Sequence, residues 1–547
     1  MNTTLYGAIG QNSFILYNIN IAASITGQGR SSIASAILLY EGLLANNVLF
    51  SSFDEIVQFI YNITHENRMF NDRDILDKDV SLEDCFFKVM TTCGYTWIPS
   101  EEEANSLWNM MANMSQEDLN RIYYKNNIYD FFNDSEAAKN AIRIILKTLD
   151  KPFLDPNKPP ECIKEQLDVL YDIIHEYVYY GHPYMDKLSR VKTMIRKISI
   201  LTDTDSTMVC FDGFYNYIKD VVIAGEEISL KGSNETITEV IDDYDFINDT
   251  FGEREIIISS GDKNDDLRYS IINTLAYVCG LLSRDYMNMY SKSYNGFEND
   301  KCLLILKNEY LFKNILLNFV KKQYVCFQEN QEGNRVPIDK ALEVKGMDID
   351  KSTLKDSTRK TLKKVLLNDI LIPEKLDAKR ILTSIVKLEK EIYKSLSSGK
   401  KDYYKPVTIR PISSYDDPLK IQGILASMVY NHLKDDKMTP ININDRNRID
   451  IVKLNINKNN LEEIMIKYPD KFVKINDLMN EITKFKEKKE IPYIAIPVDA
   501  EMPKWLLPYI DYHTIINDNI RVFPYESIGL QRLGVKETNT TNIISIF

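Results

Sequence analysis

The feature that most constrains this chain is a short acidic segment between two apolar runs at residues 198–210. The runs are rich in β-branched residues, and the string Thr-Asp-Thr-Asp-Ser at 202–206 supplies turn-forming side chains. This pattern predicts a β-hairpin. Asp203 and Asp205 would offer hard oxygen ligands of the kind that Mg²⁺ takes from proteins. For Asp-x-Asp alone, a solvated acidic turn is the simpler interpretation.

Charge is distributed unevenly along the 547 residues. The net charge of −12 argues against a protein that binds nucleic acid with its whole surface. Residues 321–410 hold 21 Lys and Arg against 13 Asp and Glu, whereas residues 201–300 hold 7 against 20. Such a chain can hold metal ions in one region and phosphates in another. The length predicts about three or four domains.

The cysteines and histidines favour neither a zinc site nor a disulfide framework. The seven cysteines form no Cys-x-x-Cys pair, and the five histidines are scattered. We therefore expect a reducing, cytoplasmic location. No apolar run has membrane-spanning length, so no membrane partner is expected.

The N-terminal segment combines Tyr6 and Gly7 with a helical pattern at residues 31–44. Glycine lets a flat group approach the backbone, and the tyrosine ring offers a face for stacking. For this dipeptide alone, a Tyr-Gly that packs on the core is the favoured interpretation.

The order of these two segments resembles family B DNA polymerases. Thr-Thr-Leu-Tyr-Gly at 3–7, with Thr26 to Arg30 downstream, resembles motif B, and Asp-Thr-Asp-Ser at 203–206 resembles motif C. The resemblance implies that Asp205 is the main ligand of catalytic Mg²⁺, in a two-metal site, and that Asp203 is a second ligand. It also implies that Tyr6 and Gly7 line the nascent base pair with the dNTP. Leu-Thr replaces the usual Tyr-Gly before motif C.

The segment between the two motifs, which includes residues 49–195, is longer than the corresponding segment of the family. These residues read as helices, with a capping-box start at residues 100–103 and a further helix over 135–149. Residues 51–150 hold 9 Lys and Arg against 18 Asp and Glu, which disfavours direct phosphate contact. The insertion is either a partner-docking module or a solvated packing unit.

A basic segment follows motif C. A strand-like run at 319–327 holds Lys-Lys-Gln-Tyr at 321–324, which resembles the Lys-Lys-Arg-Tyr motif at the junction of palm and thumb. The resemblance implies that Lys321, Lys322 and Tyr324 hold the primer–template duplex, with Lys345 of the next Lys-Gly segment near its phosphates. Gln323 replaces the usual arginine, and an exposed lysine pair is the simpler interpretation of the dipeptide.

The C-terminal part resembles the thumb of T-even-type phage replicative polymerases over residues 423–431 and 505–522. The chain ends in an apolar tail that holds Ile543, Ile544, Ile546 and Phe547. In the phage family the corresponding tail binds the sliding clamp. A tail folded on its own thumb is the alternative.

The expected fold class is therefore α+β. We expect the end of the fingers and a palm helix over 1–48, a helical insertion over 49–195, a palm sheet with helices and the catalytic hairpin over 196–350, and a mainly helical thumb with tail over 351–547. Motif A, the fingers lysine and the exonuclease region have no counterpart in the sequence. We expect the C-terminal catalytic subunit of a split DNA polymerase, completed by a separate N-terminal chain. A non-catalytic DNA- or clamp-binding protein and a processed fragment of one long polymerase are the alternatives.

Overall fold

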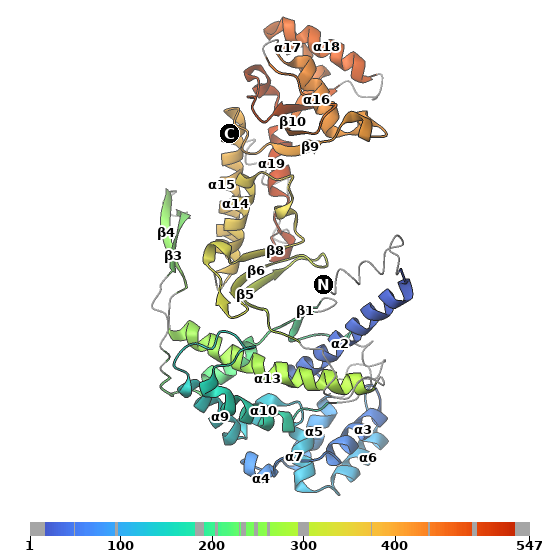
Figure 1. The fold of residues 1–547 in the computed structure, drawn as a ribbon, viewed down its shortest axis with the longest axis vertical. Coiled ribbons are helices and arrows are strands. Elements are labelled where there is room, and N and C mark those ends of the chain that lie inside the picture. The colour runs from blue at the N-terminus through green and yellow to red at the C-terminus, as the bar shows by residue number, and fades with distance from the viewer. Residues whose placement is uncertain are drawn as a thin grey trace. The chain divides into compact units, whose positions relative to one another are not determined.

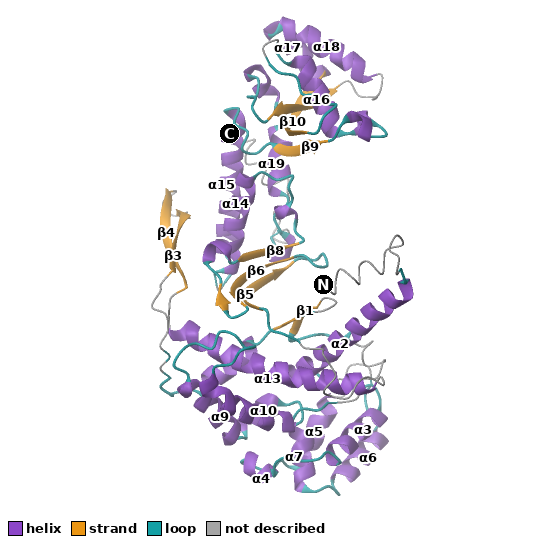
Figure 2. Cartoon of the chain, in the orientation of Figure 1, coloured by secondary structure: helices purple, strands orange, loops and turns teal. Residues whose placement is uncertain are grey.

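A computed structural model of the chain describes residues 17–48, 50–92, 97–180, 191–202, 206–228, 230, 237–245, 250–259, 263–293, 306–373, 375–435, 438–483 and 490–530. Its contacts divide the chain into two compact units. The first comprises residues 1–237, 259–309 and 331–335, and the second comprises residues 238–258, 310–330 and 336–547. The structure mixes helices with small sheets, which confirms the α+β class (Figures 1 and 2).

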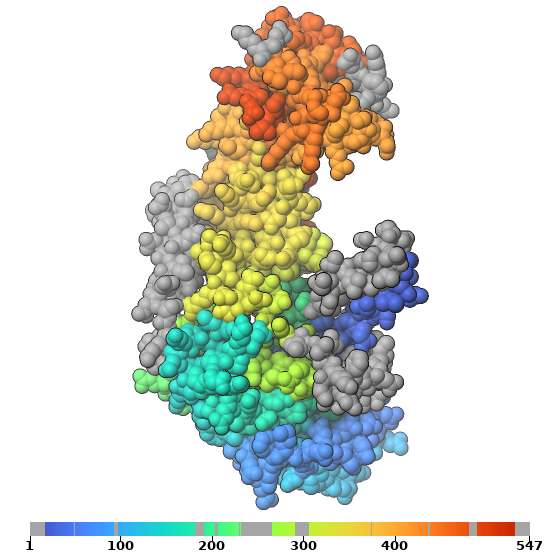
Figure 3. All heavy atoms as spheres, in the orientation of Figure 1, coloured from blue at the N-terminus to red at the C-terminus, as the bar shows by residue number. Residues whose placement is uncertain are grey.

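Helices build most of the first unit. They are α2 (Ile19–Ala45), α3 (Phe53–Thr64), α4 (Asp72–Ile75), α5 (Leu82–Thr92), α6 (Glu101–Met111), α7 (Gln116–Tyr124), α8 (Ile128–Asn133), α9 (Glu136–Thr148), α10 (Lys164–Glu176), α12 (Asp212–Tyr217) and α13 (Lys263–Ser293). On the visible face, the blue to teal residues of α3 to α10 lie against one another (Figure 3). One apolar core joins these helices to α2, α12 and α13.

Local sequence signals explain where several of these helices begin. Ser100 and Glu103 form the predicted capping box at the start of α6. The side chain of Ser135 accepts the amide of Ala138 and caps α9. The apolar face of α9 is buried through Ile142 and Ile145, among others. The helix predicted to start at residues 100–103 and the helix predicted over 135–149 are thereby confirmed.

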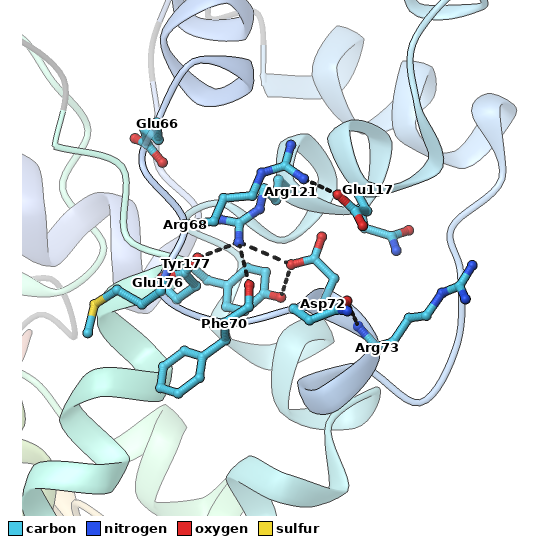
Figure 4. Close-up of polar contacts among 12 residues, drawn as sticks. Glu66, Arg68, Phe70, Asp72, Arg73, Glu117, Arg121, Glu176 and Tyr177 are labelled. Carbon is cyan, nitrogen blue, oxygen red and sulfur yellow. Dashed lines mark hydrogen bonds and ion pairs between the residues drawn. The ribbon is translucent and has the colours of Figure 1, made fainter.

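A buried cluster of charges ties α4, α7 and α10 together (Figure 4). Arg121 of α7 is 1% exposed, forms an ion pair with Glu176 of α10, and lies 3.3 Å from Asp72 of α4. The Tyr177 hydroxyl donates to Asp72 at 2.9 Å. Burial raises the pKa of Asp72, although Arg121 and Tyr177 oppose the shift. Since one arginine serves carboxylates from two other helices, it fixes the spacing of three elements.

The second unit holds most of the strands. Its first sheet contains β5 (Tyr310–Leu317), β6 (Tyr324–Gln331) and β8 (Leu342–Lys345), in which β6 pairs with both others. β6 turns back through residues 332–333 into the short β7 (Asn334–Arg335). A separate hairpin is formed by β3 (Ile237–Asp245) and β4 (Thr250–Ser259).

Beyond residue 350 the described part of the second unit is mainly helical, as the sequence predicted, but it also contains a sheet that the sequence did not predict. It holds α14 (Asp356–Val365), which continues as a π-helical segment (Leu366–Leu371), and α15 (Ala378–Ser397), α16 (Gln422–Leu433), α17 (Leu461–Lys467), α18 (Pro469–Thr483) and α19 (Tyr512–Ile520). Between them lies an antiparallel sheet in the order β11 (Glu490–Pro497), β10 (Asn447–Asn457), β9 (Lys405–Ile409). The alternating apolar residues of β10, Ile449 and Ile451 among them, are buried in one core with α14 to α19.

Among the helices that the structure describes, none combines the length and apolarity needed to cross a membrane.

Candidate functional site

The predicted acidic hairpin forms. β1 (Ser199–Thr202) pairs antiparallel with β2 (Thr207–Val209), and Thr202 stands opposite Thr207. The register shifts between Ser199 and Leu201, which marks a bulge near the start of β1. Asp203 and Asp205 lie outside the described residues. The strands on both sides of them confirm the predicted hairpin and leave their metal-binding role a prediction.

A buried carboxylate on α2 holds the start of β1. Glu41 is fully buried, and its Oε1 accepts the backbone N–H groups of Ile198 at 2.9 Å and Ser199 at 2.7 Å. Its Oε2 accepts the N–H of Lys197 at 2.9 Å and the side-chain amide of Asn47 at 2.7 Å. Burial acts to raise the pKa of Glu41, but these hydrogen bonds together lower it below its usual value. The carboxylate is therefore ionised at neutral pH.

Glu41 was not predicted as a functional residue. The signal was present, because one acidic residue stands in the apolar run Leu-Leu-Tyr-Glu-Gly-Leu-Leu at 38–44 of a predicted helix. Arg196 was missed as well. Its exposed guanidinium donates to the hydroxyl of Thr202 at 3.2 Å, one residue before Asp203 in the sequence.

The lysine pair lies in a turn and not on a strand, which corrects the sequence prediction. Residues 318–323 connect β5 to β6, and both Lys321 and Lys322 are exposed there. Lys322 adopts a left-handed backbone conformation with φ 63°. Phe319 and Val320, before the lysines, are 71% and 55% exposed. A turn places both cations at the end of the hairpin, whereas successive residues of a strand would point to opposite faces.

Gln323 closes this turn, which explains the residue that replaces the family's arginine. Its side-chain oxygen accepts the amide of Asn318 at 2.6 Å, and its backbone oxygen accepts the N–H of Asn318 at 3.0 Å. The hydroxyl of Ser527 donates to Asn318 at 2.8 Å. Gln323 therefore shapes the loop that carries the lysines.

The Lys-Gly segment packs against the same turn. Tyr324 of β6 stands opposite Lys345 of β8 in the antiparallel register. Gly346 has φ 66°, and a Cβ atom there would lie 2.6 Å from the backbone oxygen of Lys322. The structure thus brings together Lys322, Tyr324 and Lys345, which the sequence predicted as one DNA-binding group.

Lys345 already has an acidic neighbour. Its ammonium lies 2.6 Å from a carboxylate oxygen of Glu343, and the hydrogen bond to Glu343 raises the pKa of Lys345. Both side chains are partly exposed, so the pair contributes little to stability. Burial raises the pKa of the Tyr324 hydroxyl, which is therefore protonated at neutral pH and can donate a hydrogen bond.

The remaining predicted site residues lie outside the described part of the chain. These are Tyr6, Gly7 and the tail residues Ile543, Ile544, Ile546 and Phe547. Within the described part, no group of three or more His, Cys, Asp or Glu side chains could hold a metal ion. The β1–β2 hairpin belongs to the first unit, and the lysine turn belongs to the second.

Comparison with known protein families gives a match to the C-terminal part of the chain. Residues 255–545 match the family model described as divergent family B DNA polymerase. The range is more than half of the chain and includes the lysine turn and the Lys-Gly segment, but begins after Asp205. No curated protein matches the sequence.

Proposed function

The chain belongs to the divergent family B DNA polymerases, and from this premise we propose that it is the motif C, palm and thumb part of a DNA polymerase. The observation that carries the catalytic role is the β1–β2 hairpin, whose strands flank the Asp-Thr-Asp string on both sides. A two-stranded hairpin with acidic residues at its turn suits a metal site better than a solvated loop would, because its strands restrain the turn.

In the proposed reaction, the primer 3′-hydroxyl attacks the α-phosphate of a paired dNTP, and the bond to the leaving pyrophosphate breaks. Asp203 and Asp205 would hold Mg²⁺, since carboxylate oxygens are its preferred protein ligands. When bound, Mg²⁺ would neutralise the charge that develops on the phosphate. Tyr6 and Gly7 would line the nascent base pair.

The lysine turn would hold the primer–template duplex. Lys321 and Lys322 are exposed cations on a turn that Asn318 and Gln323 brace, and Lys345 follows on the paired strand. Lysine side chains at such a site act as point charges for phosphates. The proposal assigns Tyr324 a supporting contact on the same side of the sheet.

We extend the proposal to a second polypeptide. Two-metal phosphoryl transfer takes carboxylates from both sides of the site, and motif C supplies one side only. A chain with motif A and most of the fingers would supply the other. The apolar tail at 543–547 would bind a sliding clamp, in which case deleting it lowers processivity only when the clamp is present.

Complementation of primer extension tests the function. The chain is incubated with primer–template DNA, dNTPs and Mg²⁺, alone and with a polypeptide that carries a family B motif A from a neighbouring reading frame. We expect incorporation of the template-complementary nucleotide only in the mixture. Tight duplex binding by the mixture without incorporation would contradict the proposal and favour a non-catalytic DNA- or clamp-binding protein.

A further inference from the structure

We propose that Glu41 is a positioning residue that fixes the strand leading into the motif C aspartates. The proposal rests on the polymerase function proposed above. Glu41 lies near the end of α2, and both of its carboxylate oxygens are used by the segment that enters β1. It would not touch substrate, and its effect on the reaction would pass through β1.

The hairpin needs such an anchor. β1 and β2 form a sheet of two strands, and an isolated two-stranded hairpin is at best marginally stable in water. The bulge between Ser199 and Leu201 also interrupts its regular pairing. The N–H groups bound by Glu41 belong to residues 197–199, on the side of the bulge away from the aspartates. The carboxylate thus fixes the base of the strand while the bulge sets its direction.

A carboxylate at this position is costly unless it has such a role. Burial disfavours its charged form, and the C-terminal end of a helix is unfavourable for an anion. The buried neighbours Tyr40, Leu43 and Leu44 are apolar or aromatic, so packing alone would be served by another such residue. The three backbone N–H donors compensate the negative charge of Glu41. The carboxylate and the start of β1 therefore stabilise each other.

The helix that carries Glu41 is itself held in place. The hydroxyl of Ser283 on α13 donates to the Tyr40 hydroxyl at 2.8 Å, and both side chains are buried. Asn47 adds a brace after the helix, because its side-chain amide donates to Glu41 and to the backbone oxygen of Ile195 at 3.0 Å. A continuous set of contacts therefore runs from α13 through α2 to β1.

The segment between the residues held by Glu41 and the proposed metal ligands is short. Ser199 and Thr202 are separated by about 10 Å of extended strand, and Asp203 follows next in the sequence. A displacement of about 1 Å at catalytic groups can lower a rate by about two orders of magnitude. Loss of the anchor should therefore appear in the chemical step before it appears in DNA binding.

The experiment compares Glu41→Gln with Glu389→Gln in the full chain. Glutamine keeps the size of Glu41 but replaces one acceptor oxygen with an NH₂ group that faces other donors. Glu389 is equally buried, on α15 of the second unit, so its variant controls for the general effect of changing a buried carboxylate. Asn47→Ala is a milder variant if Glu41→Gln does not fold, because it leaves Glu41 and its three backbone donors in place.

The first readout is incorporation of a single nucleotide by the complemented polymerase, expressed per active site from the burst amplitude. We expect Glu41→Gln to lower this rate about tenfold or more, with duplex affinity within about twofold of wild type, and Glu389→Gln to leave the rate within about twofold. An unchanged rate per active site for Glu41→Gln in an active wild-type background would overturn the positioning role, even if the melting temperature fell.

The second readout is hydrogen exchange at the amides of residues 197–199, which needs no activity. We expect faster exchange there in Glu41→Gln than in wild type or Glu389→Gln. Unchanged exchange would overturn the proposed anchor. If wild type lacks activity but the amides respond, the anchor stands and the polymerase function fails, so the two failures are distinguishable.

Discussion

At the scale of single residues, three buried or conformationally constrained residues hold neighbouring elements in place more than the exposed charged residues do. Arg121 joins carboxylates of two other helices, Glu41 holds three backbone donors, and Gly346 admits the backbone of the lysine turn. At each of these positions the surrounding atoms suit the residue that is present and disfavour others. Substitution at these positions should therefore have larger effects than substitution of the exposed ion pairs.

We predict that Arg121→Met destabilises the first unit by about 3–5 kcal/mol, because it leaves Glu176 and Asp72 buried without their cation. Urea unfolding, followed by circular dichroism, measures the change. Arg68→Met is the matched control, because Arg68 pairs with Glu117 and Asp118 near the surface and should contribute about 1 kcal/mol or less. Equal losses of unfolding free energy in the two variants would show that the buried cluster contributes no more to stability than the ion pairs near the surface.

At the scale of elements, the sequence predicted several helices and the acidic hairpin because their signals are local. Capping side chains and apolar periodicity identify α6 and α9 without knowledge of their partners. The strand predicted at 319–327 was wrong at its start, because Phe319 and Val320 have high strand propensity but are exposed in a turn that Asn318 and Ser527 stabilise. That contact joins residues 209 apart, and no local pattern reports it.

The candidate site, like the helices, was predictable only where its signals are local in the sequence. Lys321, Lys322, Tyr324 and Lys345 were predicted as one group, and the structure gathers Lys322, Tyr324 and Lys345 because β6 and β8 pair. Glu41 was missed because its role depends on backbone amides 156 to 158 residues away in the sequence. Apolar periodicity assigns such a residue to a helix face but does not indicate which residues that face contacts.

We predict that Lys321→Ala with Lys322→Ala weakens primer–template binding and lowers the salt dependence of the affinity by about one phosphate contact per lysine. Fluorescence anisotropy at several salt concentrations measures both quantities. Lys158→Ala is the control, because Lys158 is a similarly exposed lysine in the first unit, within the acidic insertion. A salt dependence that stays at the wild-type value in the double variant would remove these lysines from the DNA interface.

Gly346→Ala tests the same turn without changing a charge. A Cβ atom at Gly346 would meet the backbone of Lys322, whereas Gly529 has a similar φ of 73° with nothing within 4 Å. Both substitutions strain the backbone, but only the first displaces the lysines. Weaker duplex binding should therefore occur in Gly346→Ala alone, and the same loss in Gly529→Ala would attribute the effect to backbone strain.

At the scale of the whole molecule, the chain is a family B DNA polymerase relative in which a helical cluster accompanies the hairpin in the first unit, and the lysine turn lies in the second unit. The acidic composition of residues 51–150 fits a cluster that avoids phosphate, whereas the basic residues 321–410 fit a duplex-facing region. The central claim is that the hairpin aspartates make this chain catalytic.

The rate of single-nucleotide incorporation by the complemented enzyme tests that claim most directly, in wild type, Asp205→Asn and Asp220→Asn. Asp220 is an exposed carboxylate shortly after the hairpin and serves as the matched control. At equal DNA occupancy, we predict that Asp205→Asn lowers the Mg²⁺-dependent rate by at least about 100-fold, and that Asp220→Asn leaves it within about twofold. A wild-type rate in Asp205→Asn would contradict the catalytic assignment of the hairpin.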